Sequence, residues 1–191
     1  MGKFNFIETK IKDLYIIETK VFGDSRGYFM EGYNKNDFFE AGLTMEFVQD
    51  NESQSKKGVL RGLHFQTKHA QGKLVRVTEG QVFDVAVDLR KGSPTFGKWE
   101  GVILTDENKK QFYVPQGFAH GFLVLSDVAV FNYKCTDYYA PKYDSGVLWN
   151  DEDIAIEWPL EGIEEIFLSD KDKIQSKLKG LEIPFEYKGD K

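Results

Sequence analysis

The chain has 191 residues, of which 41% are hydrophobic and 15% aromatic, and carries a formal net charge of −6. This length supports one substantial core and is short for two ordinary domains, so we expect a single domain over residues 1–191. The acidic balance argues against a general nucleic-acid-binding protein, whose electrostatic footprint would be basic. No long uncharged apolar segment could span a membrane, and the N-terminal residues lack the apolar core of a signal peptide. We therefore expect a cytoplasmic protein with neither a nucleic acid nor a membrane as partner.

The N-terminal segments alternate between apolar and polar residues. Residues 4–11 and 14–22 read as short strands, and their lysines are typical of sheet edges. Residues 23–27 have the composition of a turn, and residues 28–33 continue in an extended pattern. Residues 35–41 read as a short helix, with Asn34 as its N-cap and Gly42 at its end.

From residue 45 onwards the pattern is persistently that of β-structure. At least eight segments, spaced about 8–12 residues apart, are separated by Gly, Pro, Asn, Asp or Ser, which predicts an antiparallel sandwich or barrel. The segments cover residues 46–51, 59–65, 73–80, 81–90, 98–105, 110–117, 120–126 and 129–139. After residue 139 we expect loops, one or two short strands and a terminal helix from about Asp170, with residues 189–191 frayed.

Two aspartates interrupt the apolar segment 81–90. Asp84 and Asp88 are four residues apart and share one face of a strand that is otherwise apolar and therefore central. They could form a carboxylate pair for acid–base chemistry, but a solvated or hydrogen-bonded strand face is the favoured interpretation. The single cysteine, Cys135, excludes an intrachain disulfide, and its surroundings do not resemble those of a catalytic thiol.

The segment Val59–Lys73 combines an arginine, two histidines and two lysines with a strand pattern. In a regular strand Arg61 and His64 would point to opposite faces. Gly62 lies between them, and a glycine inside a strand often marks a bulge that could bring both side chains to one side. From this stretch alone His64 is either a functional imidazole or a hydrogen-bonded interior histidine.

The three histidines do not have the spacing of a cupin metal site. Such a site needs three or four converging ligands, often with two histidines two residues apart on one strand. Position 66, where the second histidine would stand, is Gln66, and His69 lies in a polar turn. We therefore expect no metal, which leaves metal-free acid–base or polar binding chemistry.

Such chemistry requires a base and a stabilising charge. His64 could be a general base near neutral pH if a carboxylate oriented it, and Lys73 suits an oxygen that becomes negative during a reaction. His120 follows a turn and opens an apolar strand, so it is either a structural histidine or a polar contact. Tyr133 lies in a strand, where most tyrosines belong to the core or an interface.

Eight strings of residues, in order along the chain from about Val21 to Asp172, together resemble the dTDP-4-dehydrorhamnose 3,5-epimerase family. No single string would be sufficient, but their combination and order are specific. They are Arg26-Gly27 with Phe29 and Glu31, Phe47–Asn51, Leu60–His64, Gln71–Arg76, Ser93–Trp99, Pro115–Phe122, Tyr133-Lys134 and Leu168–Asp172.

The resemblance implies an all-β, cupin-like jelly-roll sandwich or barrel with short peripheral helices, no metal and no cofactor. It also implies conversion of dTDP-4-dehydro-6-deoxy-D-glucose into dTDP-4-dehydro-L-rhamnose, on the route to L-rhamnose. The C4 carbonyl acidifies the hydrogens on C3 and C5, so a base can remove each one and an acid can return it from the opposite face. By the resemblance His64 is the base, Asp172 orients it, Tyr133 is the acid, and Lys73 stabilises the C4 oxygen.

The resemblance also implies how the sugar nucleotide is bound. The guanidinium and ammonium groups near the nucleotide are those of Arg61, Arg26 and Lys171, and arginine suits phosphate because its fork donates two parallel hydrogen bonds. Tyr138 stacks on the base. Asp144 stands where relatives often have glutamate. The protein is a homodimer in which an N-terminal strand reaches the neighbouring site. The remaining implied contacts are Phe29, Glu31, Gln49, Asn51 and His120.

Other functions compatible with these residues are a related epimerase that inverts one carbon or acts on another nucleotide sugar, a non-catalytic sugar-nucleotide-binding cupin, and a metal-dependent cupin enzyme. The presence of both a base and an acid in the matching positions favours an epimerase over a binding protein.

Overall fold

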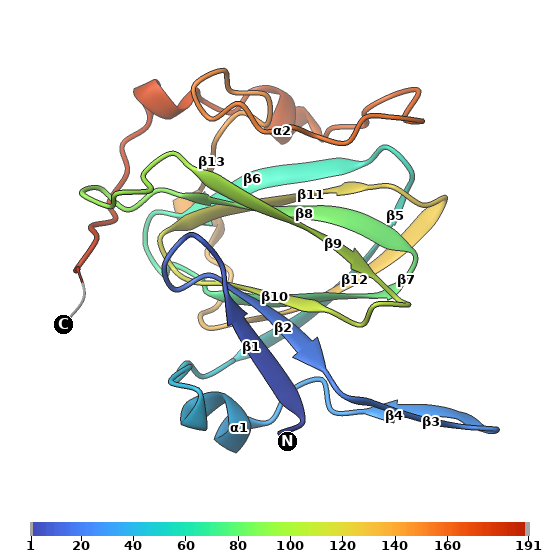
Figure 1. Ribbon diagram of the computed structural model, residues 1–191. Coiled ribbons are helices and arrows are strands. Elements are labelled where there is room, and N and C mark those ends of the chain that lie inside the picture. Colours follow the sequence, from blue (N-terminus) through green and yellow to red (C-terminus); the bar gives the residue numbers. More distant parts are fainter. Residues whose placement is uncertain (1, 190–191) are drawn as a thin grey trace.

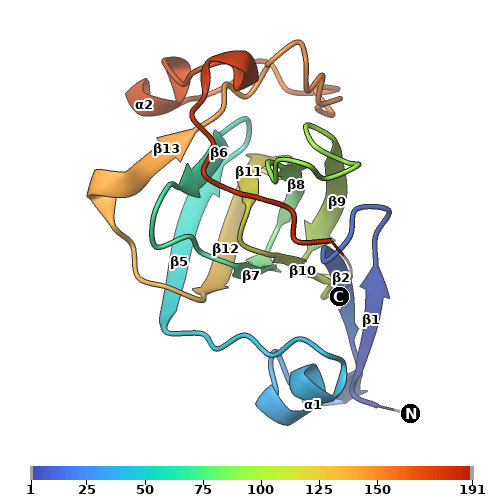
Figure 2. The ribbon, with the colours of Figure 1, turned by 90° about the vertical axis from the view of Figure 1, so that its left-hand side faces the viewer.

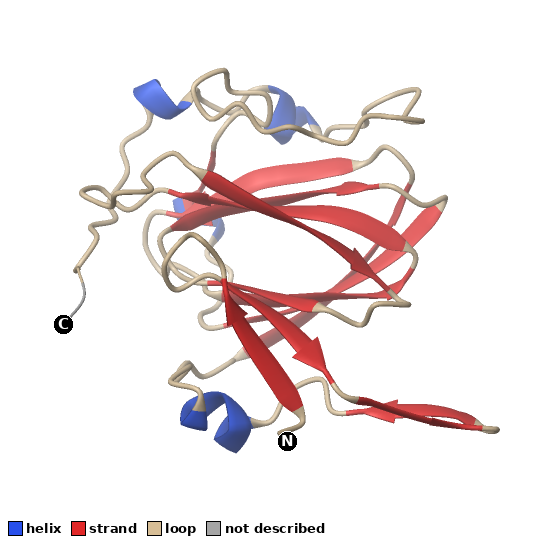
Figure 3. Ribbon diagram, viewed as in Figure 1, coloured by secondary structure: helices blue, strands red, loops and turns tan. Residues whose placement is uncertain are grey.

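The computed structural model describes residues 2–189, and its regular elements are mainly strands joined by loops (Figures 1 and 3). The last two of the three C-terminal residues expected to fray lie outside the described part. The strands are β1 Phe4–Glu8, β2 Tyr15–Thr19, β3 Val21–Asp24, β4 Gly27–Met30, β5 Gln49–Lys56, β6 Leu60–Gln66, β7 Lys73–Glu79, β8 Gln81–Asp88, β9 Trp99–Thr105, β10 Gln111–Val114, β11 Phe118–Val124, β12 Val128–Cys135 and β13 Asp144–Gly146. The helices are α1 Lys35–Glu40, α2 Asp170–Lys173 and the 3₁₀ turns η1 Pro141–Tyr143 and η2 Leu178–Gly180.

Two antiparallel sheets face each other and form a jelly-roll barrel (Figure 1). One has six strands in the order β1-β2-β10-β7-β12-β5, and the other has five in the order β13-β6-β11-β8-β9. Apolar side chains from both sheets meet between them, including Val75 and Phe112 of the first sheet and Val82 and Phe122 of the second. The predicted jelly-roll class is therefore confirmed, and β8 is an inner strand, as its apolar sequence predicted.

The C-terminal third covers the outer face of the five-stranded sheet. Leu63 and Phe65 point to this face and pack with Ile154, Ile183 and Phe185 from the loops that follow the barrel. Figure 2 shows the segment that leads to residue 189 running across one end of the barrel. Both faces of this sheet are thus buried, which holds its inward-pointing side chains rigidly.

The N-terminal elements flank the six-stranded sheet. Asn34 caps α1 by accepting hydrogen bonds from two backbone N–H groups, as the sequence predicted. Phe38 of this helix packs edge-on against the rings of Phe4 and Phe6. The hairpin of β3 and β4 forms a separate two-stranded sheet that projects away from the barrel (Figure 1).

Two sequence expectations need correction. The strand expected at residues 46–51 runs instead over β5, whose residues are all polar and which lies at an edge of its sheet. The expected terminal helix does start at Asp170 but is only 4 residues long. Among residues 2–189, no helix has the length and apolar character needed to cross a membrane.

Candidate active site

A bulge in β6 brings Arg61 and His64 into the same cavity. The pairing of β6 with β11 shifts between His120, opposite His64, and Phe122, opposite Arg61. Gly62 lies within the shift, where its φ is +130°, and a Cβ there would be 2.5 Å from the Cα of Gly121. Arg61 and His64 both line a cavity of about 450 Å³ inside the barrel. The bulge predicted from Gly62 is confirmed.

His64 forms a dyad with Asp172 from α2. The Nε2 atom of His64 lies 2.5 Å from Oδ1 of Asp172, whose side chain is only 2% exposed. Ser169 caps this short helix by accepting a hydrogen bond from the backbone N–H of Asp172, which fixes the carboxylate. Burial alone would raise the pKa of Asp172, but its hydrogen bond and charge interaction with His64 outweigh burial, and the pKa is lowered. The carboxylate is therefore ionised and can stabilise an imidazolium.

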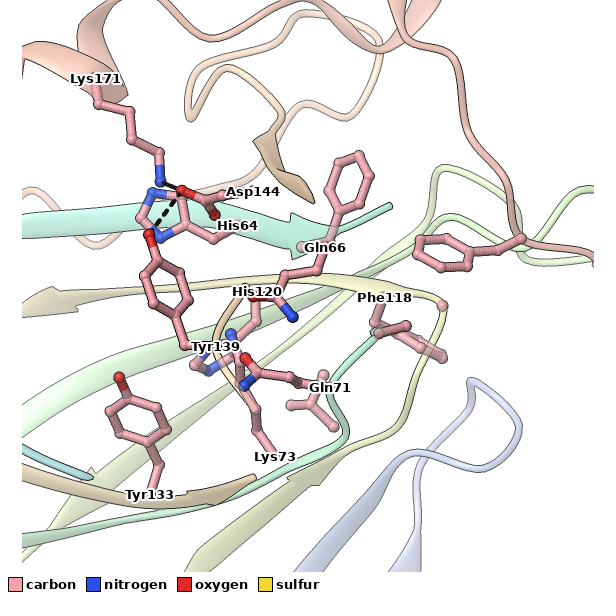
Figure 4. A pocket seen from close by; sticks show the side chains of 15 residues that line it. His64, Gln66, Gln71, Lys73, Phe118, His120, Tyr133, Tyr139, Asp144 and Lys171 are labelled. Carbon is pink, nitrogen blue, oxygen red and sulfur yellow. Dashed lines mark hydrogen bonds and ion pairs between the residues drawn. The ribbon is translucent and has the colours of Figure 1, made fainter. Parts of the chain in front are cut away.

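Tyr133 and Lys73 enter the cavity from the opposite sheet. Tyr133 is on β12 and Lys73 begins β7, whereas His64 is on the five-stranded sheet. His64, Lys73 and Tyr133 line both the 450 Å³ cavity and an adjoining compartment of about 190 Å³. Figure 4 shows His64 and Tyr133 on opposite sides of this space. An imidazole and a phenol that approach one ligand from opposite sides are thus both accessible.

Burial shifts the pKa values of Tyr133 and Lys73 in opposite directions. It raises the pKa of the Tyr133 phenol, with a smaller contribution in the same direction from Cys135. The phenol therefore keeps its proton at neutral pH. Burial lowers the pKa of the Lys73 ammonium, although the nearby Asp84 and Asp144 oppose this. Lys73 lines both compartments of the cavity, where it can donate to a negative charge that develops on a ligand.

A second histidine–carboxylate pair lies on the same sheet as His64. His120, 7% exposed, directs Nε2 to both carboxylate oxygens of the fully buried Asp84, at 2.9 and 3.0 Å. The hydrogen-bonded interpretation of Asp84 and Asp88 is confirmed, because Asp88 accepts hydrogen bonds from Arg90, Ser93 and Thr95 instead. Neither aspartate lies on a solvated face.

Two further cations lie along the cavity. Arg61 donates hydrogen bonds from Nε and Nη2 to the hydroxyl of Ser55, at 3.2 and 3.0 Å. Lys171 forms an ion pair with Asp144, and both residues line the smaller compartment. An anionic ligand can therefore find a guanidinium and an ammonium beside the dyad.

Some of the predicted contact residues lie just outside the lining of the cavity. Gln49 and Asn51 are joined by a 2.9 Å hydrogen bond on β5, and Gln49 also accepts one from the backbone of Tyr139. Tyr138 is 64% exposed and lies outside the lining. Its neighbour Tyr139 does line the cavity, and its hydroxyl is 3.4 Å from the carboxylate of Asp144.

Three predicted binding residues are not brought to the cavity of their own chain. Arg26 and Phe29 lie on the projecting hairpin, where Arg26 pairs with Asp24 and Phe29 is 65% exposed. Glu31 follows the hairpin and pairs with Lys3 at 2.8 Å.

Sequence reasoning missed the partnership of Asp84 with His120 and the position of Tyr139. The first had a signal, since a lone aspartate in an apolar strand needs a buried partner, but the partner is 36 residues away on the next strand of the sheet. The position of Tyr139 in the cavity lining had no signal in the sequence. Among residues 2–189, no group of three or more His, Cys, Asp or Glu side chains is arranged to hold a metal ion.

This fold and this site define an enzyme of the jelly-roll class in which an imidazole and a phenol face each other across an internal cavity. A family model described as dTDP-4-dehydrorhamnose 3,5-epimerase matches residues 8–180. The chain belongs to this family.

Three relatives illustrate the range of the similarity. The dTDP-4-dehydrorhamnose 3,5-epimerase of Methanothermobacter thermautotrophicus is 58% identical over 173 residues, which cover 91% of this chain and 94% of that protein. The crystal structure of dTDP-6-deoxy-D-glucose-3,5-epimerase RmlC from Legionella pneumophila Philadelphia 1, in complex with dTDP-4-keto-L-rhamnose, has a TM-score of 0.91 at 54% identity, covering 94% of this chain and 95% of that one. ChmJ, a 3'-monoepimerase from Streptomyces bikiniensis in complex with dTDP-quinovose, has a TM-score of 0.83 at 33% identity, covering 90% and 86%.

Proposed function

We propose that this chain converts dTDP-4-dehydro-6-deoxy-D-glucose into dTDP-4-dehydro-L-rhamnose by inverting C3 and C5, with neither a metal nor a cofactor. One observation carries the proposal: His64 and Tyr133 reach one cavity from opposite sheets, with Lys73 beside them. Inversion of a carbon requires removal of a proton from one face and its return from the other. Family membership supports the substrate class.

Each inversion begins with proton removal by His64. Its Nε2 faces Asp172, so Nδ1 is the nitrogen that takes the proton from C3 or C5. The resulting imidazolium is stabilised by the ionised Asp172. The electron pair left on carbon moves to the C4 oxygen, which Lys73 stabilises by its charge and a hydrogen bond.

Each inversion ends with proton delivery by Tyr133 from the other face. The phenol loses its proton to the same carbon, so His64 has gained one proton and Tyr133 has lost one. Both groups must return to their starting states by exchange with water before the second carbon reacts. Every proton introduced at C3 and C5 therefore comes from solvent.

The nucleotide is held by the cations beside the dyad. Arg61 and Lys171 bind the diphosphate, and Lys171 exchanges its partner Asp144 for a phosphate oxygen. Tyr138, exposed in the free chain, stacks on the base, while Gln49, Asn51 and His120 provide further polar contacts. Asp144 is shorter than glutamate and acts chiefly on Lys171.

The hairpin of β3 and β4 completes the site of a second copy in a homodimer. This hairpin exposes large apolar side chains, Val21, Phe22, Tyr28 and Phe29, and carries Arg26 away from its own cavity. Mixing Arg26→Ala chains with His64→Asn chains tests the proposal. One of the two sites in each mixed dimer would then be intact, so activity should appear on mixing two impaired proteins. No gain above the sum of the parents would refute a contribution in trans.

Incubation with the substrate in D₂O, followed by NMR, tests the reaction itself. We expect deuterium at both C3 and C5 with conversion to the L-sugar, and activity that persists after treatment with a chelator. Tyr133→Phe should exchange protons without inverting the carbon, because His64 returns deuterium to the face from which it took the proton, whereas His64→Asn should do neither. Absence of label in the wild-type reaction would leave only a binding protein.

A one-carbon epimerase is the second candidate, because the fold also occurs in a 3'-monoepimerase. Label confined to one carbon in the same experiment would identify it.

A further inference from the structure

The role of Asp84 is not explained by the proton transfers at His64 and Tyr133. This carboxylate is fully buried in β8, and the imidazole of His120 is its hydrogen-bonding partner among the described side chains. The ring of His120 is held further by Phe131, which stacks on it with centroids 6.2 Å apart. The position and tilt of this imidazole are therefore fixed before any ligand binds.

The hydrogen-bond geometry indicates which nitrogen of His120 faces Asp84. Burial raises the pKa of Asp84, while its interactions with His120 and with the nearby Lys73 oppose this. Nε2 of His120 lies 2.9 and 3.0 Å from the two oxygens of Asp84, and an ionised carboxylate can only accept, so Nε2 is the donor in this pair. A neutral imidazole that donates Nε2–H to Asp84 leaves the lone pair of Nδ1 toward the cavity.

The residues shared by both compartments offer few hydrogen-bond acceptors. Besides His120, the residues that line both compartments are His64, Lys73, Tyr133 and Lys171. The two lysines can only donate, the phenol is the proton donor, and His64 is the base. The carboxylates that line one compartment each have a partner, because Asp172 is paired with His64 and Asp144 with Lys171. Nδ1 of His120 is thus the acceptor among the shared lining residues that has no part in the proton transfers.

We propose that Asp84 is a positioning residue that fixes the tautomer of His120, so that Nδ1 accepts a hydrogen bond from a ring hydroxyl of the sugar beside the C4 carbonyl. This inference rests on the proposed function. The two histidine–carboxylate pairs then have different roles. Asp172 stabilises the imidazole of His64 when it becomes charged, whereas Asp84 keeps the imidazole of His120 neutral and correctly oriented.

Asp84→Asn tests the proposal, because the side chain keeps its shape. An amide NH₂ can donate to Nε2, which favours the tautomer with the proton on Nδ1 and turns the acceptor in the cavity into a donor. The sugar hydroxyl then loses its acceptor. We expect kcat/KM to fall about 10–100-fold, with the affinity for dTDP, which lacks the sugar, within twofold of wild type.

The protonation of His120 can be observed directly by ¹⁵N NMR, since the chain has only 3 histidines. In the ligand-free wild type at neutral pH we expect Nε2 protonated and Nδ1 unprotonated, and in Asp84→Asn the reverse. Asp88→Asn is the matched control, because Asp88 is an equally buried residue of the same strand that bonds Arg90 rather than His120. It should leave the His120 signals unchanged. A wild-type His120 protonated on both nitrogens would overturn the proposal.

A double-mutant cycle with His120→Gln separates action through His120 from action through Lys73. If Asp84 acts through His120, Asp84→Asn should cost less than threefold more in the His120→Gln background. A full 10–100-fold loss in that background would mean that Asp84 acts on Lys73 and would refute the inference. Failure of the wild type to epimerise would instead refute the proposed function, and the NMR result would still decide the tautomer.

Discussion

Replacement of Asp172 by asparagine probes the dyad with little change of shape. The amide can still form a hydrogen bond with Nε2 of His64, through its oxygen or through its NH₂ group, and the backbone bond to Ser169 is untouched. The ring therefore keeps its orientation. What is lost is the negative charge that stabilises the imidazolium formed when His64 takes a proton.

The size of the effect follows from the geometry. With Nε2 and Oδ1 2.5 Å apart, the two charge centres are roughly 4 Å apart, and at an effective dielectric constant of about 20 their attraction is about 4 kcal/mol. Because each 1.36 kcal/mol in a barrier changes a rate about tenfold, kcat should fall about 10³-fold. The substrate is bound before the charge forms, so KM should change less than about threefold.

The assay is deuterium uptake at C3 and C5 under saturating substrate. Asp170→Asn is the control, because Asp170 lies in the same short helix but is exposed and pairs with Lys173 at the surface. It should stay within twofold of wild type. A loss of less than tenfold in Asp172→Asn would show that the charge of Asp172 is not what stabilises the imidazolium.

Three other predictions concern pH and stability. Burial lowers the pKa of Lys73 and raises that of Tyr133. As the pH rises, Lys73 should therefore lose its proton before Tyr133 does, and kcat should fall. In Lys73→Arg the fall in kcat should move to higher pH. Burial would raise the pKa of Asp88, but hydrogen bonds from Arg90, Ser93 and Thr95 lower this pKa below its usual 3.8. The ionised carboxylate therefore stabilises the fold above pH 3.8, and this stabilisation is lost as the pH falls through the lowered pKa. In denaturant titrations, the difference in unfolding free energy between wild type and Asp88→Asn should become smaller in acid. Gly62→Ala would put a Cβ 2.5 Å from the Cα of Gly121 at a φ of +130°, costing roughly 3 kcal/mol and lowering the thermal midpoint by about 6–12 °C; an unchanged midpoint in calorimetry would contradict the close approach.

The sequence predicted those features that depend on local pattern. Alternation of apolar and polar residues identified most of the strands, and Gly62 correctly marked the bulge that turns Arg61 and His64 to one side. The polar sequence of β5 has no such alternation of apolar side chains, so the bounds of this strand were predicted wrongly. The site residues came from a resemblance, because period and spacing cannot indicate which distant segments meet.

The pairing of Asp84 with His120 illustrates this limit. The apolar neighbours of Asp84 indicated a buried strand, and burial of a carboxylate requires a partner. The identity of that partner depends on strand order, since β11 lies beside β8 although β9 and β10 separate them in the chain. Without that order, the sequence favoured a hydrogen-bonded or solvated strand face for Asp84 but could not name its partner.

The dyad joins residues 108 positions apart in the chain, and this distance has a consequence during synthesis. A polypeptide emerging from the ribosome contains His64 long before Asp172, so its base lacks its counter-ion until almost the whole protein has been made. A product truncated after β13 would retain all the strands and the phenol, but its imidazole would lack the carboxylate that stabilises its charged form. By the proposed mechanism, such incomplete copies would be inactive.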